Sequence, residues 1–241
     1  MRKLWVFGDS YSACTGIGRK IYGKYPPEDQ WFDGKYDHYR WPDQLARQFG
    51  WRLMDFSQGG KSNVDILVDY TRNAKDIGID DGLIIGLTHS ARLRVYSPLV
   101  DHFANTTLYG LEHGNLREDK SLEGLKHFFI NNAHKYQDKY NSDWLKTYLS
   151  IPQATILHYN LPRDVQSWKQ WSNGDIDDMH PSMNGINIIA KMVHYAMINK
   201  ERVVHSKMQW EPLVEFQGLP YVSYNSNEVN DGWKKYFHGT S

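Results

Sequence analysis

Two short stretches of the chain carry side chains that could perform nucleophilic catalysis together. "FGDSYSA", near the start of the sequence, places Ser10 three residues after the end of an apolar run. "DIDDMHPSMNG", near the other end, places Asp177 three residues before His180. A serine becomes a nucleophile when a base removes its proton and a third group orients that base. These residue types predict that His180 accepts the Ser10 proton and that Asp177 holds the imidazole and stabilises its protonated form.

Several of these residues also have simpler structural explanations. Gly, Asp and Ser are common turn residues, so the tripeptide alone does not identify a nucleophile. Two further carboxylates in the same loop, Asp175 and Asp178, could orient the histidine instead. The single cysteine, Cys14, lies four residues after the serine, and we expect it to be a small buried side chain rather than the nucleophile.

A site for acyl transfer also needs hydrogen-bond donors that face the oxyanion forming on the substrate. The stretch "DFSQGGKSN" leaves an expected strand and enters an expected helix, and its glycine pair allows a tight turn with close backbone approach. The stretch therefore predicts the Gly60 N–H as a donor. It does not fit a phosphate-binding loop, because that motif needs a glycine six residues before Lys61, where the chain has Asp55.

Apolar periodicity predicts the elements that must position these residues. Continuous apolar runs predict strands buried on both faces at residues 4–7 and 83–87. Residues 52–56 are a further strand candidate, and residues 154–158 are expected to form the fourth strand. Helical spacing predicts helices at 41–49, after a Ser62 cap, over 122–148 as one helix or two stacked ones, and after Ser182. The helix after Ser62 is expected to carry its apolar face on Val64, Leu67, Val68, Thr71 and Ala74. Strands alternating with helices favour a parallel sheet covered on both faces, with ligands at the carboxyl ends of its strands.

Composition narrows the function classes further. The 241 residues include 28 basic and 28 acidic side chains, so the formal net charge is zero and nothing indicates a nucleic-acid partner. No stretch approaches the roughly 18 apolar residues of a membrane span. The apolar run near the N-terminus is too short for the apolar region of a signal peptide. The sequence therefore predicts a soluble protein, cytoplasmic or phage-associated. No Cys/His cluster has the spacing of a metal site, and the aromatic share of 14% suits a groove that binds sugars as well as a packed core.

In this order, Gly-Asp-Ser after the first strand, a glycine after the second and Asp-x-x-His-Pro before the last helix resemble the SGNH/GDSL hydrolases. The resemblance covers roughly residues 3–199. It implies an α/β fold of the flavodoxin-like, three-layer α/β/α type, with a parallel sheet of about five strands. It also implies that Ser10 is nucleophile and N–H donor, that Gly60 is an oxyanion donor, and that Asp177 and His180 complete the triad. No metal or organic cofactor is implied.

The chain departs from the family at its third motif. Members usually carry Gly-x-Asn-Asp after the third strand, where the asparagine donates to the oxyanion, but here the strand runs into "GLTHSARLR". By strand register Ser90 falls nearest the asparagine position, with Thr88 and His89 as alternates. Arg92 is either structural or reaches the site. A missing donor costs roughly 3–4 kcal/mol of transition-state stabilisation.

The sequence thus predicts a serine esterase that cleaves a short-chain acyl ester, such as an O-acetyl group on a carbohydrate, through an acyl-Ser10 intermediate. The alternative is a non-catalytic glycan-binding or structural protein, for instance of a phage particle, on the same scaffold. Residues 1–204 are expected to form the α/β domain, with a loop and helical insertion over about 97–150. Residues 97–120 are expected to be a long loop over one end of the sheet. Residues 205–241 are expected to be an irregular extension that packs on the domain, with a strand or two.

Overall fold

The computed structural model describes residues 1–14, 37–88, 92–99, 101–106, 116, 118–158, 183–204, 210–216 and 219–223. Its strands are β1 (Lys3–Phe7), β2 (Arg52–Asp55), β3 (Gly82–Leu87), β4 (Leu93–Ser97), β5 (His102–Thr106), β6 (Ala154–His158), β7 (Val203–Val204), β8 (Trp210–Phe216) and β9 (Leu219–Ser223). Its α-helices are α2 (Trp41–Phe49), α3 (Asn63–Asn73), α5 (Glu123–Leu149) and α7 (Met183–Ile198), and short 3-10 turns lie at Asp37–Tyr39, Ala74–Asp76 and Lys120–Leu122.

Five parallel strands form the central sheet, in the order β2-β1-β3-β6-β7. Residues 4–7 of β1 and every residue of β3 are buried, as expected of strands covered on both faces. This strand order is the flavodoxin-like one, and its topological switch point lies between β1 and β3. The predicted fold class and sheet are therefore confirmed.

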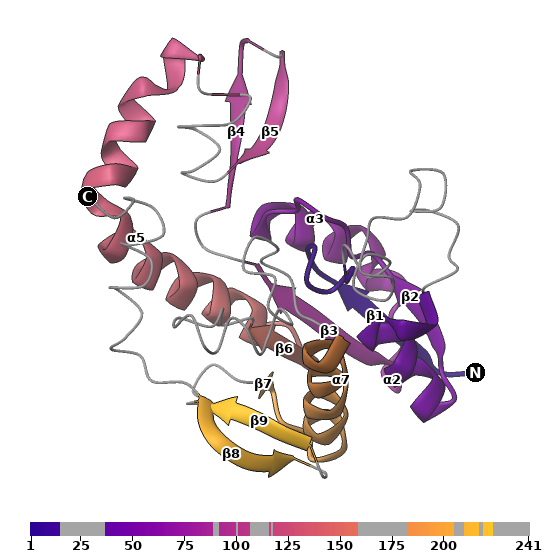
Figure 1. Cartoon of the computed structure of the whole chain (residues 1–241). Coiled ribbons are helices and arrows are strands. Elements are labelled where there is room, and N and C mark those ends of the chain that lie inside the picture. The colour runs from indigo at the N-terminus through magenta and orange to yellow at the C-terminus, as the bar shows by residue number, and fades with distance from the viewer. Residues whose placement is uncertain are drawn as a thin grey trace, which may run out of the picture.

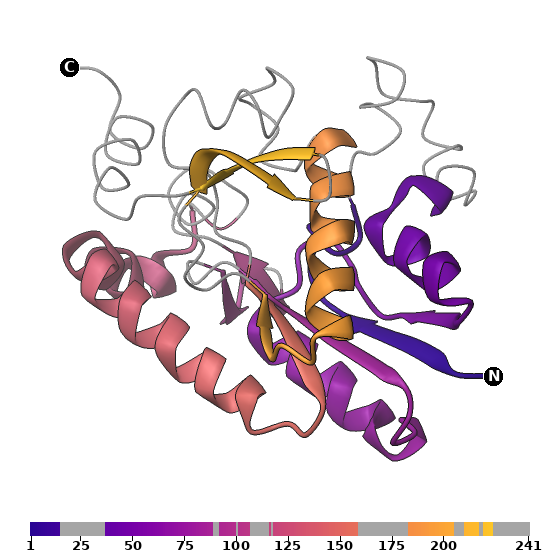
Figure 2. The ribbon, with the colours of Figure 1, turned by 90° about the horizontal axis from the view of Figure 1, so that it is seen from below.

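Two hydrophobic cores flank the sheet because successive side chains of a strand point to opposite faces. Leu4 and Val6 of β1 pack on one face with α2 and α7. Trp5 and Phe7 pack on the other face with α3 and α5. Figure 1 and Figure 2 show the resulting three layers, with α7 and α2 on one side of the sheet and α5 and α3 on the other.

Two segments differ from the sequence expectations, and two others take one of the forms that the sequence left open. The expected loop at 97–120 instead contains most of an antiparallel hairpin, β4–β5, which pairs Leu93 with Thr106 at its base. The fifth strand of the sheet is the two-residue β7, which is too short to leave an apolar pattern. The extension after residue 204 holds a second hairpin, β8–β9, and α5 is a single helix of 27 residues.

The apolar face predicted for α3 was partly wrong. The helix buries Asn63 and Ile66 toward the sheet, whereas Val64 is 40% exposed. Leu67 and Tyr70 pack partly against the same core as Ile66. The helix is rotated in this way because a polar side chain, the Asn63 amide, occupies an interior position at its first turn. Hydrophobic periodicity cannot detect a buried amide.

No helix in the described part of the chain is long and apolar enough to cross a membrane.

Candidate active site

Ser10 lies in the turn that leaves the carboxyl end of β1. The turn runs from Gly8 to Cys14 and closes with a hydrogen bond from the Ala13 N–H to the Asp9 carbonyl, at 2.9 Å. The Ser10 side chain is 4% exposed, and its hydroxyl oxygen has no hydrogen-bond partner among the described residues. A buried hydroxyl is normally paired. An unpaired one at the ligand-binding edge of a parallel sheet is the arrangement expected of a nucleophile whose partner comes from another segment.

Gly8 lets this turn fold tightly. A Cβ atom at Gly8 would lie 2.1 Å from the Ser12 hydroxyl oxygen and 2.5 Å from the Ser12 Cβ. Any larger residue would therefore force the turn apart and displace Ser10 from its position. The glycine of the Gly-Asp-Ser motif is required here by a steric contact within the turn.

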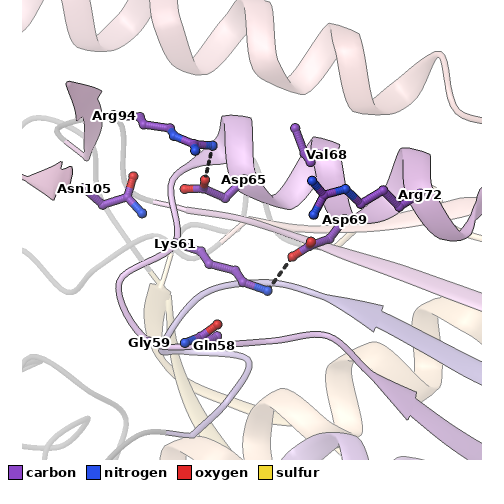
Figure 3. Close-up of a pocket in the computed structure, with 9 residues that line it drawn as sticks. All are labelled: Gln58, Gly59, Lys61, Asp65, Val68, Asp69, Arg72, Arg94 and Asn105. Atoms are coloured by element: carbon purple, nitrogen blue, oxygen red, sulfur yellow. Dashed lines mark hydrogen bonds and ion pairs between the residues drawn. The ribbon is translucent and has the colours of Figure 1, made fainter. Parts of the chain in front are cut away.

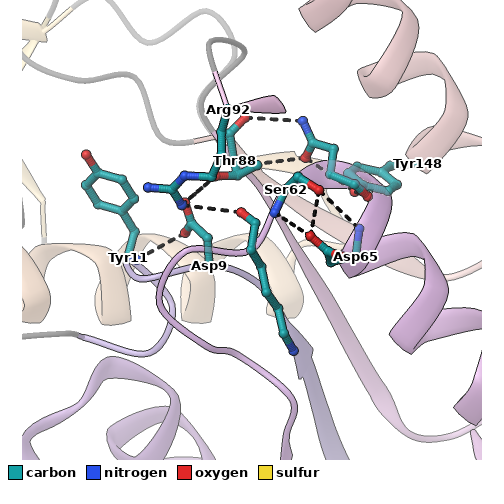
Figure 4. A network of polar contacts seen from close by, with 9 residues as sticks. Asp9, Tyr11, Ser62, Asp65, Thr88, Arg92 and Tyr148 are labelled. Carbon is teal, nitrogen blue, oxygen red and sulfur yellow. Dashed lines mark hydrogen bonds and ion pairs between the residues drawn. The ribbon is translucent and has the colours of Figure 1, made fainter. Parts of the chain in front are cut away.

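The carboxylate of Asp9 joins the Ser10 turn to the end of β3 (Figure 4). Asp9 is fully buried; its Oδ1 accepts from the Tyr11 N–H at 3.0 Å and its Oδ2 accepts from the Thr88 hydroxyl. Arg92 Nη1 also donates to Oδ2, at 3.1 Å. The carboxylate thus orders the turn on both sides of Ser10 and receives a compensating positive charge from Arg92.

Arg92 binds three loops with one nitrogen. Besides Asp9, its Nη1 donates to the Lys61 carbonyl and to the Thr88 hydroxyl oxygen, both at 3.3 Å. Lys61 directly follows Gly60, so the same nitrogen contacts the residue before Ser10 and the residue after the predicted glycine donor. The guanidinium Nε and Nη2 have no partner among the described residues. Arg92 is thus a structural clamp just after β3, where the sequence has no Gly-x-Asn-Asp stretch.

The Gly60 turn has the geometry that its glycines predicted. Gly60 has a φ of +85°, which L-residues with side chains rarely adopt, and the turn is closed from the Lys61 N–H to the Gln58 carbonyl at 3.5 Å. The Gln58 N–H donates to the Gly8 carbonyl at 3.2 Å. This bond places the Gly60 turn beside the Ser10 turn.

The start of α3 is anchored to the end of β3. Ser62 and Asp65 form the predicted capping box, with the Ser62 N–H donating to the Asp65 carboxylate at 3.0 Å. Asn63 Nδ2 donates to the Thr88 carbonyl at 3.3 Å, and the Thr88 N–H donates to Asn63 Oδ1 at 3.1 Å. The Tyr148 hydroxyl of α5 donates to the Asn63 carbonyl at 3.0 Å. These buried bonds hold the glycine turn and the β3 end in fixed register.

The structure therefore brings together the described members of the predicted site. Ser10, Gly60 and Thr88 follow β1, β2 and β3, whose carboxyl ends lie at one edge of the sheet. The other predicted residues lie outside the described part of the chain: Asp177, His180, Ser90, His89 and the competing Asp175 and Asp178. Both donors of Thr88 are engaged, its hydroxyl with Asp9 and its N–H with Asn63.

Sequence reasoning missed the buried polar connections. The sequence indicates only that Asn63 begins a helix and that Tyr148 belongs to the helical stretch over 122–148. In the structure, the Asn63 amide bonds to the Thr88 carbonyl and the Tyr148 hydroxyl bonds to the Asn63 carbonyl. The only sequence signal that Asn63 makes a buried contact is its position directly after the Ser62 cap. Tyr148 has no such signal beyond its helical spacing. The sequence points to Arg92, but two of its three partners lie 31 and 83 residues away and leave no local signal.

Cys14 is a buried structural residue, as the sequence indicated. Its side chain is 2% exposed, and its sulfur lies 3.7 Å from the carbonyl oxygens of Tyr11 and Ser12. Burial raises the pKa of the Cys14 thiol from 9.0 to about 12. We therefore expect the folded protein to resist thiol reagents such as Ellman's reagent at pH 8, and to react after unfolding in urea. Rapid reaction of the folded protein would contradict this burial.

The same pKa shift makes stability depend on pH in the alkaline range. In the unfolded chain the thiol ionises near pH 9, whereas the folded thiol stays protonated to about pH 12. Ionisation above pH 9 thus favours the unfolded state, and the free energy of unfolding falls with a slope of up to roughly 1.4 kcal/mol per pH unit. The free energy of unfolding, measured in urea at pH 8, 9 and 10, should fall less steeply with pH in Cys14→Ala than in the wild type.

Comparison with known proteins finds likeness in structure only. No protein-family model matches the chain, and no curated protein matches it. Among solved structures, the chain is similar to a carbohydrate esterase whose active site is described as displaying divergent catalytic and non-catalytic binding functions, with 15% identity and a TM-score of 0.45. That match covers 83% of this chain and 65% of the other, so the chain spans about two thirds of that protein's length.

Two further solved structures cover nearly the whole chain. One is a catalytic mutant of an acetylxylan esterase from Geobacillus stearothermophilus, with 12% identity, a TM-score of 0.35, and coverage of 100% of this chain and 95% of that one. The other is a member of the lipolytic G-D-S-L family from Veillonella parvula, with 9% identity, a TM-score of 0.35, and coverage of 99% and 98%.

Proposed function

We propose that the protein is a serine hydrolase that cleaves a short-chain acyl ester, such as an O-acetyl group on a carbohydrate. The observation that carries the proposal is the Ser10 hydroxyl, which is buried and unpaired within the described residues at the switch point of the sheet. Two further features support it. The Gly60 turn adjoins the Ser10 turn, and the Asp9 carboxylate fixes the backbone around the serine.

In the proposed reaction, Ser10 Oγ attacks the ester carbonyl carbon while His180 accepts the hydroxyl proton. Asp177 orients the imidazole and stabilises its charged form. The oxyanion that forms accepts hydrogen bonds from the N–H groups of Ser10 and Gly60. Collapse of this intermediate expels the alcohol, which takes the proton from His180 and leaves an acyl-Ser10. Water activated by His180 then attacks the acyl carbon and releases the acid.

The third oxyanion donor of the proposal is Ser90, with His89 as its alternate. Thr88 is the weaker candidate, because its hydroxyl hydrogen donates to Asp9 and its N–H donates to Asn63. A donor that is already engaged cannot strengthen its bond to the developing charge without losing another bond.

Labelling by a fluorophosphonate probe tests the function directly. We expect the wild-type protein to take up the probe on the peptide that contains Ser10 and to hydrolyse p-nitrophenyl acetate faster than the octanoate ester. His180→Ala should lower kcat/KM by about 10³-fold or more, because the serine then lacks its base. His127→Ala is the matched control, since His127 is exposed on α5, far along the chain from the site. If the wild type neither labels nor hydrolyses aryl esters, the proposal is wrong.

A further inference from the structure

A polar pocket of about 280 Å³ adjoins the Gly60 turn and has no part in the proposed chemical steps. It is lined by Gln58, Gly59 and Lys61 from that turn, by Asp65, Val68, Asp69 and Arg72 from α3, and by Arg94 and Asn105 from the β4–β5 hairpin (Figure 3). The bond from the Gln58 N–H to the Gly8 carbonyl places the near end of the pocket beside the nucleophile turn. The hairpin that the sequence did not predict closes the other end.

The two carboxylates of the pocket are already engaged. Arg94 Nη1 lies 2.6 Å from Asp65 Oδ1, and Lys61 Nζ lies 2.5 Å from Asp69 Oδ2, the two ion pairs drawn in Figure 3. Burial tends to raise the pKa of Asp65, but hydrogen bonds from Ser62 and Asn105 and the charge of Arg94 hold it below its ordinary value. Neither carboxylate is therefore available to a cation, and no metal-binding group of His, Cys, Asp or Glu occurs among the described residues.

Arg72 supplies the unmatched charge. It has no hydrogen-bond or ion-pair partner in the described part of the chain, and its guanidinium points along α3 over the pocket (Figure 3). Of the described lining residues, three are basic and two are acidic, so the lining carries one excess positive charge. A guanidinium binds carboxylate and phosphate groups with paired hydrogen bonds. The pocket thus presents a vacant donor for one anionic group.

The rest of the lining favours a hydroxyl-bearing ligand. Val68 is the only large apolar side chain among the described lining residues, so an acyl chain would find little apolar contact. Side-chain amides and charged groups at the wall can exchange hydrogen bonds with hydroxyls. The volume lies just below the roughly 300 Å³ at which sites for drug-sized ligands begin, which suits a single sugar unit.

We propose that this pocket binds a sugar unit bearing one carboxylate or phosphate, with Arg72 as the contact to the anionic group. Because the pocket adjoins the Ser10 turn, this unit belongs to the alcohol side of the ester substrate, a step that rests on the proposed function. The binding itself does not depend on turnover.

Titration followed by NMR tests the binding. Glucuronate, glucose 6-phosphate and glucose would each be added to the ¹⁵N-labelled full chain. We expect one or both acids to shift the amide signals of Gln58, Gly59 and Asn105, whereas glucose should not. Arg72→Gln should weaken that binding by about tenfold, because it removes a charged hydrogen bond. Lys75→Gln is the matched control, since it removes an exposed positive charge just beyond the end of α3, outside the pocket.

Three outcomes would overturn the inference: neither acid binds, glucose binds as well as the acids, or Arg72→Gln binds as tightly as the wild type. Comparing the affinities for glucuronate and glucose 6-phosphate shows whether the pocket prefers a carboxylate or a phosphate. Failure of the proposed function would appear separately, as absence of fluorophosphonate labelling in a protein that still binds the acid. If only the pocket inference is wrong, the protein would still take up the fluorophosphonate probe but would not bind the acids.

Discussion

Replacing Ser10 with alanine is expected to abolish probe labelling and to lower kcat/KM for p-nitrophenyl acetate by about 10⁴-fold or more, because no other group can form the acyl intermediate. The fold should survive. The hydroxyl makes no hydrogen bond with any described residue, so its removal leaves no such partner unsatisfied. The free energy of unfolding, measured in urea, should change by less than roughly 1 kcal/mol.

Ser57→Ala is a matched control for this substitution. The Ser57 hydroxyl is the other serine hydroxyl in the described part of the chain that is buried without a partner, and it lies on the neighbouring loop beside Gly8. Ser57→Ala should retain labelling and turnover. Equal losses in Ser10→Ala and Ser57→Ala would show that both act only through packing, and full activity in Ser10→Ala would exclude it as the nucleophile.

Replacing Arg92 with alanine is expected to lower the free energy of unfolding by about 3–5 kcal/mol. The substitution removes the guanidinium that lies 3.1 Å from the fully buried Asp9 carboxylate, and a buried charge without its partner is strongly destabilising. It also releases the Lys61 carbonyl and so loosens the Gly60 turn. Urea unfolding measures the first effect. The second should appear as a fall in kcat larger than the change in KM, measured where the variant is still folded.

Two companion variants separate charge from geometry. Arg92→Lys keeps the charge, but its side chain is shorter and ends before the position of Arg92 Nη1, which makes all three contacts. The variant should therefore keep more stability than alanine and still lose kcat. Adding Asp9→Asn to Arg92→Ala should recover part of the lost stability, because the unpaired charge is gone, without restoring turnover. If the free energy of unfolding of Arg92→Ala lies within about 1 kcal/mol of the wild-type value, Arg92 does not act as a structural clamp.

Much of the framework could be predicted from the sequence because its signals are local. The buried run before Gly8, the helix at 41–49 and the Ser62–Asp65 cap all depend on neighbouring residues, and each lies where periodicity or capping placed it. The β4–β5 hairpin was not predicted because its short strands mix exposed polar and aromatic side chains with half-buried ones and leave no continuous apolar run. The strand β7 was not predicted because its two residues are too few to show a periodic apolar pattern.

The sequence by itself determined the order of four of the five sheet strands and of the α-helices between them, the turn that carries Ser10 and the glycine turn that follows β2. The tertiary structure decided which of these meet. Parallel strands joined by helices bring β1 beside β3, so Asp9 contacts Thr88 across 79 residues of chain and Asn63 joins Thr88 across 25. Such contacts depend on strand order and on the burial of polar groups that must find partners. Local pattern encodes neither, since it records which face of an element is apolar and not which element lies next to it.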